Sequence, residues 1–250
     1  MLLLLAGVIA VVAPEALRAF RADRPAPAQD RPGPVILVPG YGGGTGGLRV
    51  LAQRIRATGG RATVLELPGG GTGDLREQAR RLDRATSDVL RSGARSVDVI
   101  GYSAGGVTAR LWAHDHDGAH KARRIITLGA PHRGAEVAAA GQAFAPGACP
   151  LACQQLVPGS AVLSRLGGRV PERPAWMSIW TTLDETVTPP DSARLDGAVN
   201  VPLQSLCPAV RISHGDLPTD PLVTAIVLDA LGPSALRAPA PTGCQGDRLP

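Results

Sequence analysis

The chain has 250 residues, of which 44% are hydrophobic and 19% are charged, and these proportions are typical of a globular protein that buries one large core. Its net charge of +5 comes from basic residues that are nearly all arginine and lie scattered along the chain, which argues against a nucleic-acid patch. Aromatic residues make up only 3%, so stacking platforms for single-stranded nucleic acid are not expected. We therefore predict a single domain with no nucleic-acid partner.

Residues 1–28 are predicted to be a signal peptide or another N-terminal export segment. The apolar run at 1–13 is too short to span a bilayer, which takes about 20 residues. No basic residue precedes this run, so two alternatives stay open: the true start lies upstream, or the segment is retained as a weak anchor. Residues 29–34 are predicted to be a proline-rich linker. This organisation predicts a secreted or cell-envelope protein.

From residue 35 onward, short aliphatic runs alternate with helical patterns. The run at 35–38 is typical of a strand that is buried on both faces of a parallel sheet. We predict helices that begin near residues 48, 75, 104 and 221. Further strands are predicted over 62–67, 97–100, 124–128, 176–180 and 199–206. The alternation predicts the α/β class, with a doubly wound, mainly parallel sheet and helices on both faces.

The strongest motif lies between the strand at 97–100 and the helix that follows it. It reads Gly101-Tyr102-Ser103-Ala104-Gly105, a G-x-S-x-G pattern in a strand–turn–helix context. In such a turn the strand and the helix nearly collide two residues on either side of the serine, where only glycine fits. The turn places the Ser103 hydroxyl over the N-terminus of the helix, where unpaired N–H groups favour negative charge. Ser103 is therefore the candidate nucleophile.

A serine nucleophile needs a base and an acid that orients the base, in the chain order Ser, Asp or Glu, His. His214 lies in a loop after the last predicted strand and is the candidate base. Asp184 follows the predicted strand at 176–180, at the sheet edge where open α/β folds place their sites. Asp184 is therefore the candidate acid, and the adjacent Glu185 remains an alternative.

The other histidines are not expected to act in catalysis. His132 also ends a strand, but it precedes every suitable acid in the chain. The remaining three lie beside aspartates at a helix end and are interpreted as a solvated turn: His114, His116 and His120. We predict no metal site and no cofactor.

Acyl transfer also needs N–H donors for the oxyanion. One is the N–H of Ala104, and the other is expected from the glycine-rich loop after the first strand, with Tyr41 as the candidate. An alternative for this loop is a dinucleotide site, since residues 42–47 match G-x-G-x-x-G and Glu66 ends the next strand. The three residues at 39–41 that separate the strand from the first glycine of this motif disfavour that alternative.

Four cysteines, an even number, agree with an exported and oxidised protein. Only Cys149 and Cys153 are close in sequence, and no second close pair completes a zinc site. Four cysteines allow three pairings. We favour Cys149 with Cys153, which closes a small loop, and Cys207 with Cys244, which would hold the tail near the last strand.

With these motifs the chain resembles the small exported bacterial lipases of the α/β-hydrolase fold, the lipase class 2 type without a large lid. The resemblance implies hydrolysis of carboxylic esters by a Ser103, Asp184 and His214 triad, with oxyanion donors from Tyr41 and Ala104. The chain differs from the family at Pro39 and Tyr102, where histidine is common. The resemblance rests on segments 38–43, 101–106, 128–134, 184–189 and 193–201 and on His214.

The resemblance places an α/β-hydrolase catalytic domain at 35–232, before a Pro/Gly-rich tail at 233–250. We expect an ester or lipid substrate, transient contact with lipid surfaces, and a monomer. The same triad would serve an acyltransferase or a thioesterase, and a catalytically inactive envelope-binding protein is a further alternative.

The segment after the strand that ends at residue 128 decides whether a lid covers the site. Only 43 residues separate His132 from Trp176, and they must also supply a sheet-packing helix. We therefore expect no large cap, and a fixed apolar rim at 144–157. The site should be open in water and act on soluble short-chain esters, with no abrupt rise in rate at the solubility limit.

Overall fold

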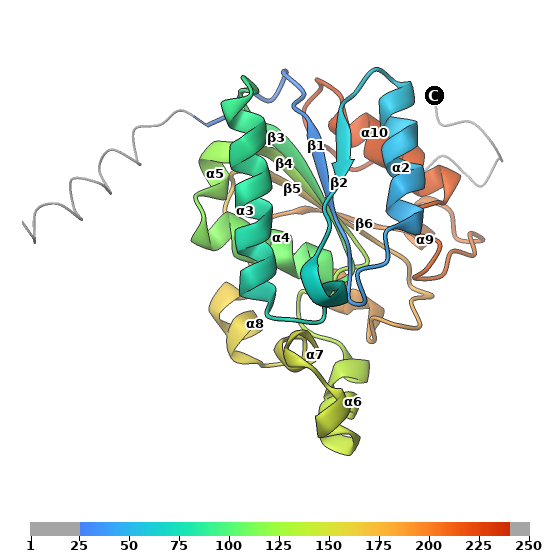
Figure 1. Ribbon diagram of the computed structural model, residues 1–250. Helices are drawn as coiled ribbons and strands as arrows, with labels where there is room; N and C mark the ends of the chain where they lie inside the picture. The colour runs from blue at the N-terminus through green and yellow to red at the C-terminus, as the bar shows by residue number, and fades with distance from the viewer. Residues whose placement is uncertain (1–25, 241–250) are drawn as a thin grey trace, which may run out of the picture.

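Figure 1 shows a computed structural model of the chain, which describes residues 26–240. In this part of the chain six parallel strands form one sheet, in the order β2-β1-β3-β4-β5-β6. The predicted export segment lies almost wholly outside the described residues. The strands are β1 (Val35–Val38), β2 (Ala62–Val64), β3 (Val97–Tyr102), β4 (Ala122–Leu128), β5 (Ala175–Trp180) and β6 (Val199–Pro202).

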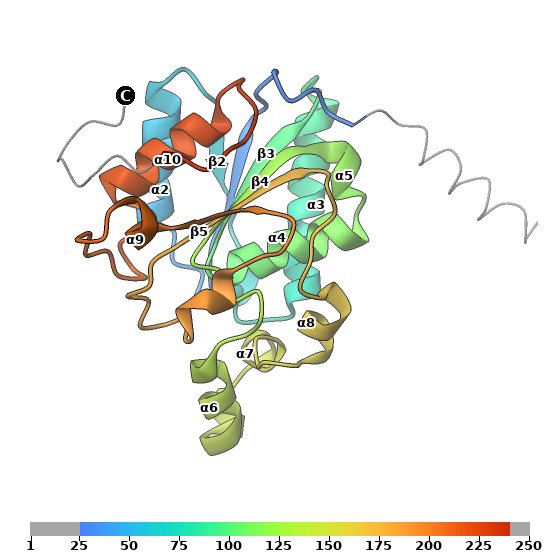
Figure 2. The same ribbon diagram turned by 180° about the vertical axis from the view of Figure 1, so that it is seen from behind.

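Helices cover both faces of the sheet, as predicted (Figures 1 and 2). On one face Leu82 and Leu111 pack with Val99 of the sheet, and on the other face Leu51 and Ile226 belong to the same cluster as Ile126. The helices of the first face are α3 (Leu75–Arg91), α4 (Ala104–Asp115) and the short α5 (Gly118–Lys121). Those of the second face are α2 (Gly46–Ala57), α9 (Leu203–Leu206) and α10 (Pro221–Leu231).

The order of the strands reverses between β1 and β3. From β1 the chain moves outward to β2 and then returns to pair β3 with the other side of β1. In an open parallel sheet such a reversal leaves a crevice at the carboxyl ends of the two strands, where ligands bind. The G-x-S-x-G turn and the glycine-rich loop both start at this crevice, because they follow β3 and β1 directly.

Two predicted strands end earlier than expected. The strand predicted at 62–67 stops at Val64, because β2 is an edge strand whose partner β1 has only four residues, and the chain then turns into η1 (Pro68–Gly71). The strand predicted at 199–206 stops at Pro202, which has no N–H to donate to a neighbouring strand. Residues beyond it form α9, in which Leu203 and Leu206 are buried.

The connection from β4 to β5 consists of short helices. They lie beyond the carboxyl ends of the strands, which point downward in Figure 1. Prolines and glycines at 146, 147, 150, 158 and 159 divide the segment, so no long sheet-packing helix forms. These helices are α6 (Glu136–Phe144), η2 (Pro146–Ala148), α7 (Leu151–Gln155) and α8 (Ala161–Leu166), and η3 (Pro190–Ala193) follows β5.

The predicted disulfide between Cys149 and Cys153 is present at the start of α7. The other predicted pair, Cys207 with Cys244, includes Cys244, which lies outside the described residues. Over residues 26–240, no helix is long and apolar enough to cross a membrane.

Candidate active site

Ser103 occupies a sharp turn between β3 and α4. Its φ of 53° and ψ of −127° lie outside the regions that non-glycine residues normally adopt, a conformation that costs on the order of 1–3 kcal/mol and is maintained by surrounding structure. The Ser103 N–H donates to the Leu128 carbonyl at 2.8 Å, so the end of β4 helps to hold the turn. Ala104 is the first residue of α4, and its N–H therefore has no acceptor within the helix.

The glycines on either side of Ser103 are required by close backbone contacts, as the motif predicts. A Cβ atom on Gly101 would lie 2.6 Å from the Gly105 carbonyl oxygen, and one on Gly105 would lie 2.3 Å from the Val38 carbonyl oxygen. Both distances are too short for any side chain. The turn therefore brings the start of α4 against the end of β1, beside the glycine-rich loop.

His214 and Asp184 form a buried pair. The imidazole Nδ1 lies 2.7 Å from Asp184 Oδ2, and the two residues are 5% and 4% exposed. The other carboxylate oxygen accepts N–H bonds from Thr186 at 3.0 Å and Val187 at 2.6 Å. An ionised carboxylate can only accept hydrogen bonds. In a neutral imidazole the hydrogen is therefore assigned to Nδ1, which faces Asp184, and Nε2 is left as an acceptor.

Tyr102 connects the serine turn to His214. Its hydroxyl donates to the His214 carbonyl at 3.2 Å, and the two rings lie with their centroids 5.1 Å apart. Burial, followed by the charge of Asp184, raises the pKa of Tyr102 to about 12, so the phenol keeps its hydrogen at neutral pH. The structure thus brings His214 and Asp184 beside the residue that precedes Ser103.

The alternative acid, Glu185, contacts the backbone of His214. Its Oε2 accepts the His214 N–H at 3.2 Å, and the residue itself is exposed. Glu185 therefore helps to fix the loop at His214, while Asp184 is the carboxylate on the imidazole.

Gly129 lies directly beneath the His214–Asp184 pair. A Cβ atom there would lie 3.1 Å from His214 Nδ1, 3.2 Å from Asp184 Oδ2 and 2.6 Å from Leu217 Cδ1, and the residue has a φ of 54°. Sequence reasoning missed this role, as it missed the contact of Tyr102 with His214. The position of Gly129 at the end of a strand, just before the loop at 130–134, is the feature of the sequence from which its role could have been predicted.

The glycine-rich loop closes over the serine turn. A Cβ atom on Gly40 would lie 2.8 Å from Ser103 Cβ, and one on Gly43 would lie 2.9 Å from the Gly70 backbone in η1. The neighbouring Tyr41 is 45% exposed at the mouth of the site. The loop is therefore held between Ser103 and η1, with Tyr41 next to the residue that contacts the serine.

The remaining histidines lie apart from this arrangement. His132 is buried, with Nε2 at 3.1 Å from Thr127 Oγ1, and burial together with the Arg110 charge holds its pKa well below the usual range. The three near the end of α4 each face an aspartate: His114 with Asp115, His116 with Asp83, and His120 with Asp117. Within residues 26–240, no three His, Cys, Asp or Glu side chains are grouped as metal ligands would be.

A cavity of about 480 Å³ lies at the opposite end of the sheet. It is lined by residues from the linker and from the ends of α2 and α10, with Asp98 among them, and none of the candidate residues borders it. The candidate residues therefore lie at the carboxyl edge of the sheet, away from this cavity.

Comparisons with known proteins agree with the architecture at this edge. The PGAP1-like alpha/beta domain family matches residues 70–145. Aspergillus fumigatus lipase B superimposes with a TM-score of 0.65 at 20% identity, over 79% of this chain and 52% of that one. The mature form of Bacillus licheniformis lipase BlEst2 superimposes with a TM-score of 0.65 at 18% identity, over 84% of this chain and 95% of that one. The chain has an α/β-hydrolase fold.

A third α/β structure, the monoacylglycerol lipase of Paleococcus ferrophilus, has a TM-score of 0.56 at 15% identity, over 79% of this chain and 93% of that one. The chain spans about half the length of the Aspergillus lipase chain. A comparison with curated proteins finds no sequence match.

Proposed function

We propose that this α/β-hydrolase cleaves carboxylic esters through an acyl-enzyme on Ser103. The observation that carries the proposal is the buried His214–Asp184 pair, 2.7 Å apart, at the same sheet edge as the strained Ser103 turn. An imidazole held in one tautomer by a carboxylate is the arrangement that activates a serine hydroxyl.

The reaction would proceed in two steps. His214 Nε2 takes the Ser103 proton while Oγ attacks the ester carbonyl carbon, and the N–H groups of Ala104 and Tyr41 hold the oxyanion. The imidazolium then gives its proton to the departing alcohol, which leaves the acyl group on Ser103. A water molecule, deprotonated by the same imidazole, releases the acid and restores the serine.

More specifically, we propose that the protein is a small exported lipase of the lipase class 2 type and that it is a monomer. Neighbours that are named as lipases and the disulfide in the β4–β5 connection support it. An acyltransferase or thioesterase would use the same residues and differ only in the acceptor of the acyl group.

Replacing the nucleophile tests the proposal. Ser103→Ala should lower kcat on p-nitrophenyl esters by on the order of 10⁶, as loss of the serine does in other triads, and should abolish labelling by a serine-directed phosphonate. Ser92→Ala, at the exposed end of α3, is the matched control and should behave as wild type. Esters of increasing chain length, with water or an added alcohol as acceptor, distinguish lipase, esterase and acyltransferase. Turnover that survives in Ser103→Ala would refute the site.

A further inference from the structure

The β4–β5 connection contains a long uncharged segment. Residues 137–164 include no Asp, Glu, Lys, Arg or His, whereas 19% of the whole chain is charged. Within this segment we call residues 137–151, from α6 to the start of α7, the apolar projection. Of the residues in α6 only Ala138 is buried. Packing into a hydrophobic core therefore does not explain why the other residues of this helix are apolar.

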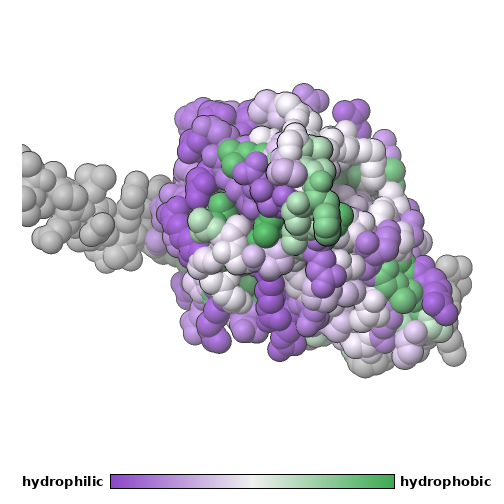
Figure 3. Space-filling model, turned by 90° about the horizontal axis from the view of Figure 1, so that it is seen from below, coloured by the Kyte–Doolittle hydropathy of each residue, from purple (hydrophilic) through white to green (hydrophobic). Residues whose placement is uncertain are grey.

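Exposed apolar side chains are concentrated at the end of the molecule that holds the candidate site. In the apolar projection Val137 is 59% exposed, Phe144 90% and Leu151 44%. Tyr41 and Leu183, at 45% and 41%, lie in the loops after β1 and β5 at the same edge. Figure 3 views this end of the molecule and shows apolar patches among polar surface.

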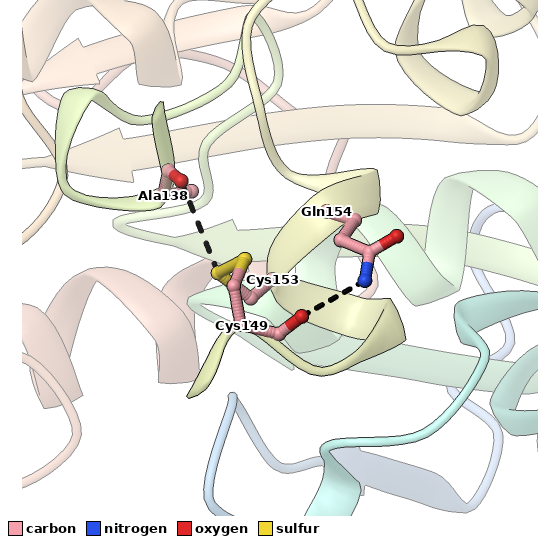
Figure 4. Close-up of a disulfide and its surroundings, with 4 residues drawn as sticks. All are labelled: Ala138, Cys149, Cys153 and Gln154. Carbon is pink, nitrogen blue, oxygen red and sulfur yellow. Dashed lines mark hydrogen bonds between the residues drawn. A yellow bond between two sulfur atoms is a disulfide. The ribbon is translucent and has the colours of Figure 1, made fainter. Parts of the chain in front are cut away.

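The apolar projection is anchored at both ends. The Glu136 N–H donates to the Thr188 carbonyl at 2.9 Å, and the Ala152 N–H donates to the Thr72 carbonyl at 3.1 Å. The Cys149–Cys153 disulfide links the projection to α7 and lies against the Ala138 carbonyl of α6, with Cys153 Sγ 3.9 Å from that oxygen (Figure 4). The exposed apolar residues therefore sit on a fixed base beside the site and not on a free loop.

The chemistry of this surface fits a lipid–water interface better than a protein partner. An interfacial segment presents apolar side chains without charges to the acyl region, and basic residues attract anionic headgroups. The net charge of +5 favours such headgroups, and Arg133, which lies shortly before the uncharged segment, is exposed. Arg165, directly after the segment, is also exposed but is paired with Asp115 at 2.7 Å. A stable protein interface takes about 800 Å² from each partner, which three separate apolar side chains do not supply.

We propose that the apolar projection docks the protein onto lipid surfaces with anionic headgroups, with the mouth of the candidate site facing the lipid. The proposal deepens the proposed function, because it places the site against ester-bearing lipid, but docking itself needs no catalysis. It can therefore be tested with the Ser103→Ala protein, so that a failure of docking and a failure of the hydrolase assignment are seen separately.

The test is the binding of Ser103→Ala to vesicles, measured by co-sedimentation. We expect binding to phosphatidylcholine vesicles that strengthens when phosphatidylglycerol is mixed in. Adding Phe144→Ala should weaken the partition coefficient roughly tenfold, the order expected when one large apolar side chain leaves an interface. Adding Val50→Ala, which removes a side chain 36% exposed on α2, should leave it unchanged.

A fold control and the contrary outcomes complete the experiment. Phe144→Ala in the otherwise wild-type chain should keep its rate on a soluble ester. Equal vesicle binding with and without Phe144, or no binding at all, would overturn the proposal. A dimer in solution that dissociates in Phe144→Ala, without vesicle binding, would show instead that a second copy covers this surface.

Discussion

At the scale of single residues, His214 is fixed from three sides by groups with different tasks. Asp184 contacts the imidazole, Glu185 accepts the backbone N–H, and Tyr102 donates to the carbonyl. Only the first of these bonds decides which imidazole nitrogen carries the hydrogen. The other two hold the loop, and an exposed carboxylate such as Glu185 contributes little energy there.

This division predicts unequal effects of two neighbouring substitutions. Asp184→Asn should lower kcat by on the order of 10⁴, the loss that follows a wrong imidazole tautomer in serine triads. Glu185→Gln should cost less than about tenfold, because its amide oxygen can still accept the His214 N–H. Steady-state rates on a soluble ester measure both. A larger loss of kcat in Glu185→Gln than in Asp184→Asn would show that Glu185 is the acid of the triad.

Gly129 gives a second prediction at this scale. Gly129→Ala would force a Cβ atom against His214, Asp184 and Leu217 and put alanine at positive φ, which costs about 1 kcal/mol or more. Because displacement of catalytic groups by about 1 Å can cost on the order of 10²-fold, we expect a loss of that order in kcat, together with a lower Tm. Gly168→Ala, where a Cβ atom meets open space, should change neither. Normal activity in Gly129→Ala would contradict this geometry.

At the scale of elements, patterns in the sequence predict the strands and the main helices but not where all of them end. The strands β1, β3, β4 and β5 are buried except at Tyr102 and Ala175, so their aliphatic runs identify them from composition alone. β6 ends at Pro202, which has no N–H to donate. The end of β2 depends on how many residues its neighbour β1 offers for pairing, which is a property of the assembled sheet. The contact of Tyr102 with His214 joins residues 112 positions apart and is unpredictable for the same reason.

The β4–β5 connection shows how an element that lacks a core of its own can be fixed. The buried Arg110 of α4 donates to the carbonyls of Leu166 at 3.1 Å and Gly167 at 2.8 Å, and at 3.4 Å to that of His132. Burial lowers the pKa of Arg110 to about 10, so the guanidinium is still charged at neutral pH. One side chain therefore holds the start and the end of the connection together at the base of the apolar projection.

At the scale of the whole molecule, the two ends of the sheet have different tasks. At the amino end Arg123 forms a buried ion pair with Asp98 at 2.7 Å and donates to the carbonyls of Leu231 and Gly232. Arg124 donates to the carbonyl of Ala230. These bonds satisfy carbonyls at the C-terminus of α10, where positive charge is favourable. The amino end thus stabilises the fold, and the carboxyl end is left to the loops of the candidate site.

The anchors of the β4–β5 connection predict an open site whose turnover does not depend on an interface. A lid must leave the site before soluble substrate can enter, so lidded enzymes gain activity when lipid opens them. Here hydrogen bonds to Arg110, Thr72 and Thr188 and the Cys149–Cys153 disulfide hold the connection in place. No end of it is therefore free to swing as a lid. We therefore expect kcat on a soluble short-chain ester to be the same with and without vesicles of non-hydrolysable ether lipid, even though those vesicles bind the protein. The rate is measured at saturating ester, and vesicle binding is measured in the same samples. A rise of roughly tenfold or more on adding the vesicles would show that part of this connection moves on docking and covers the site in water.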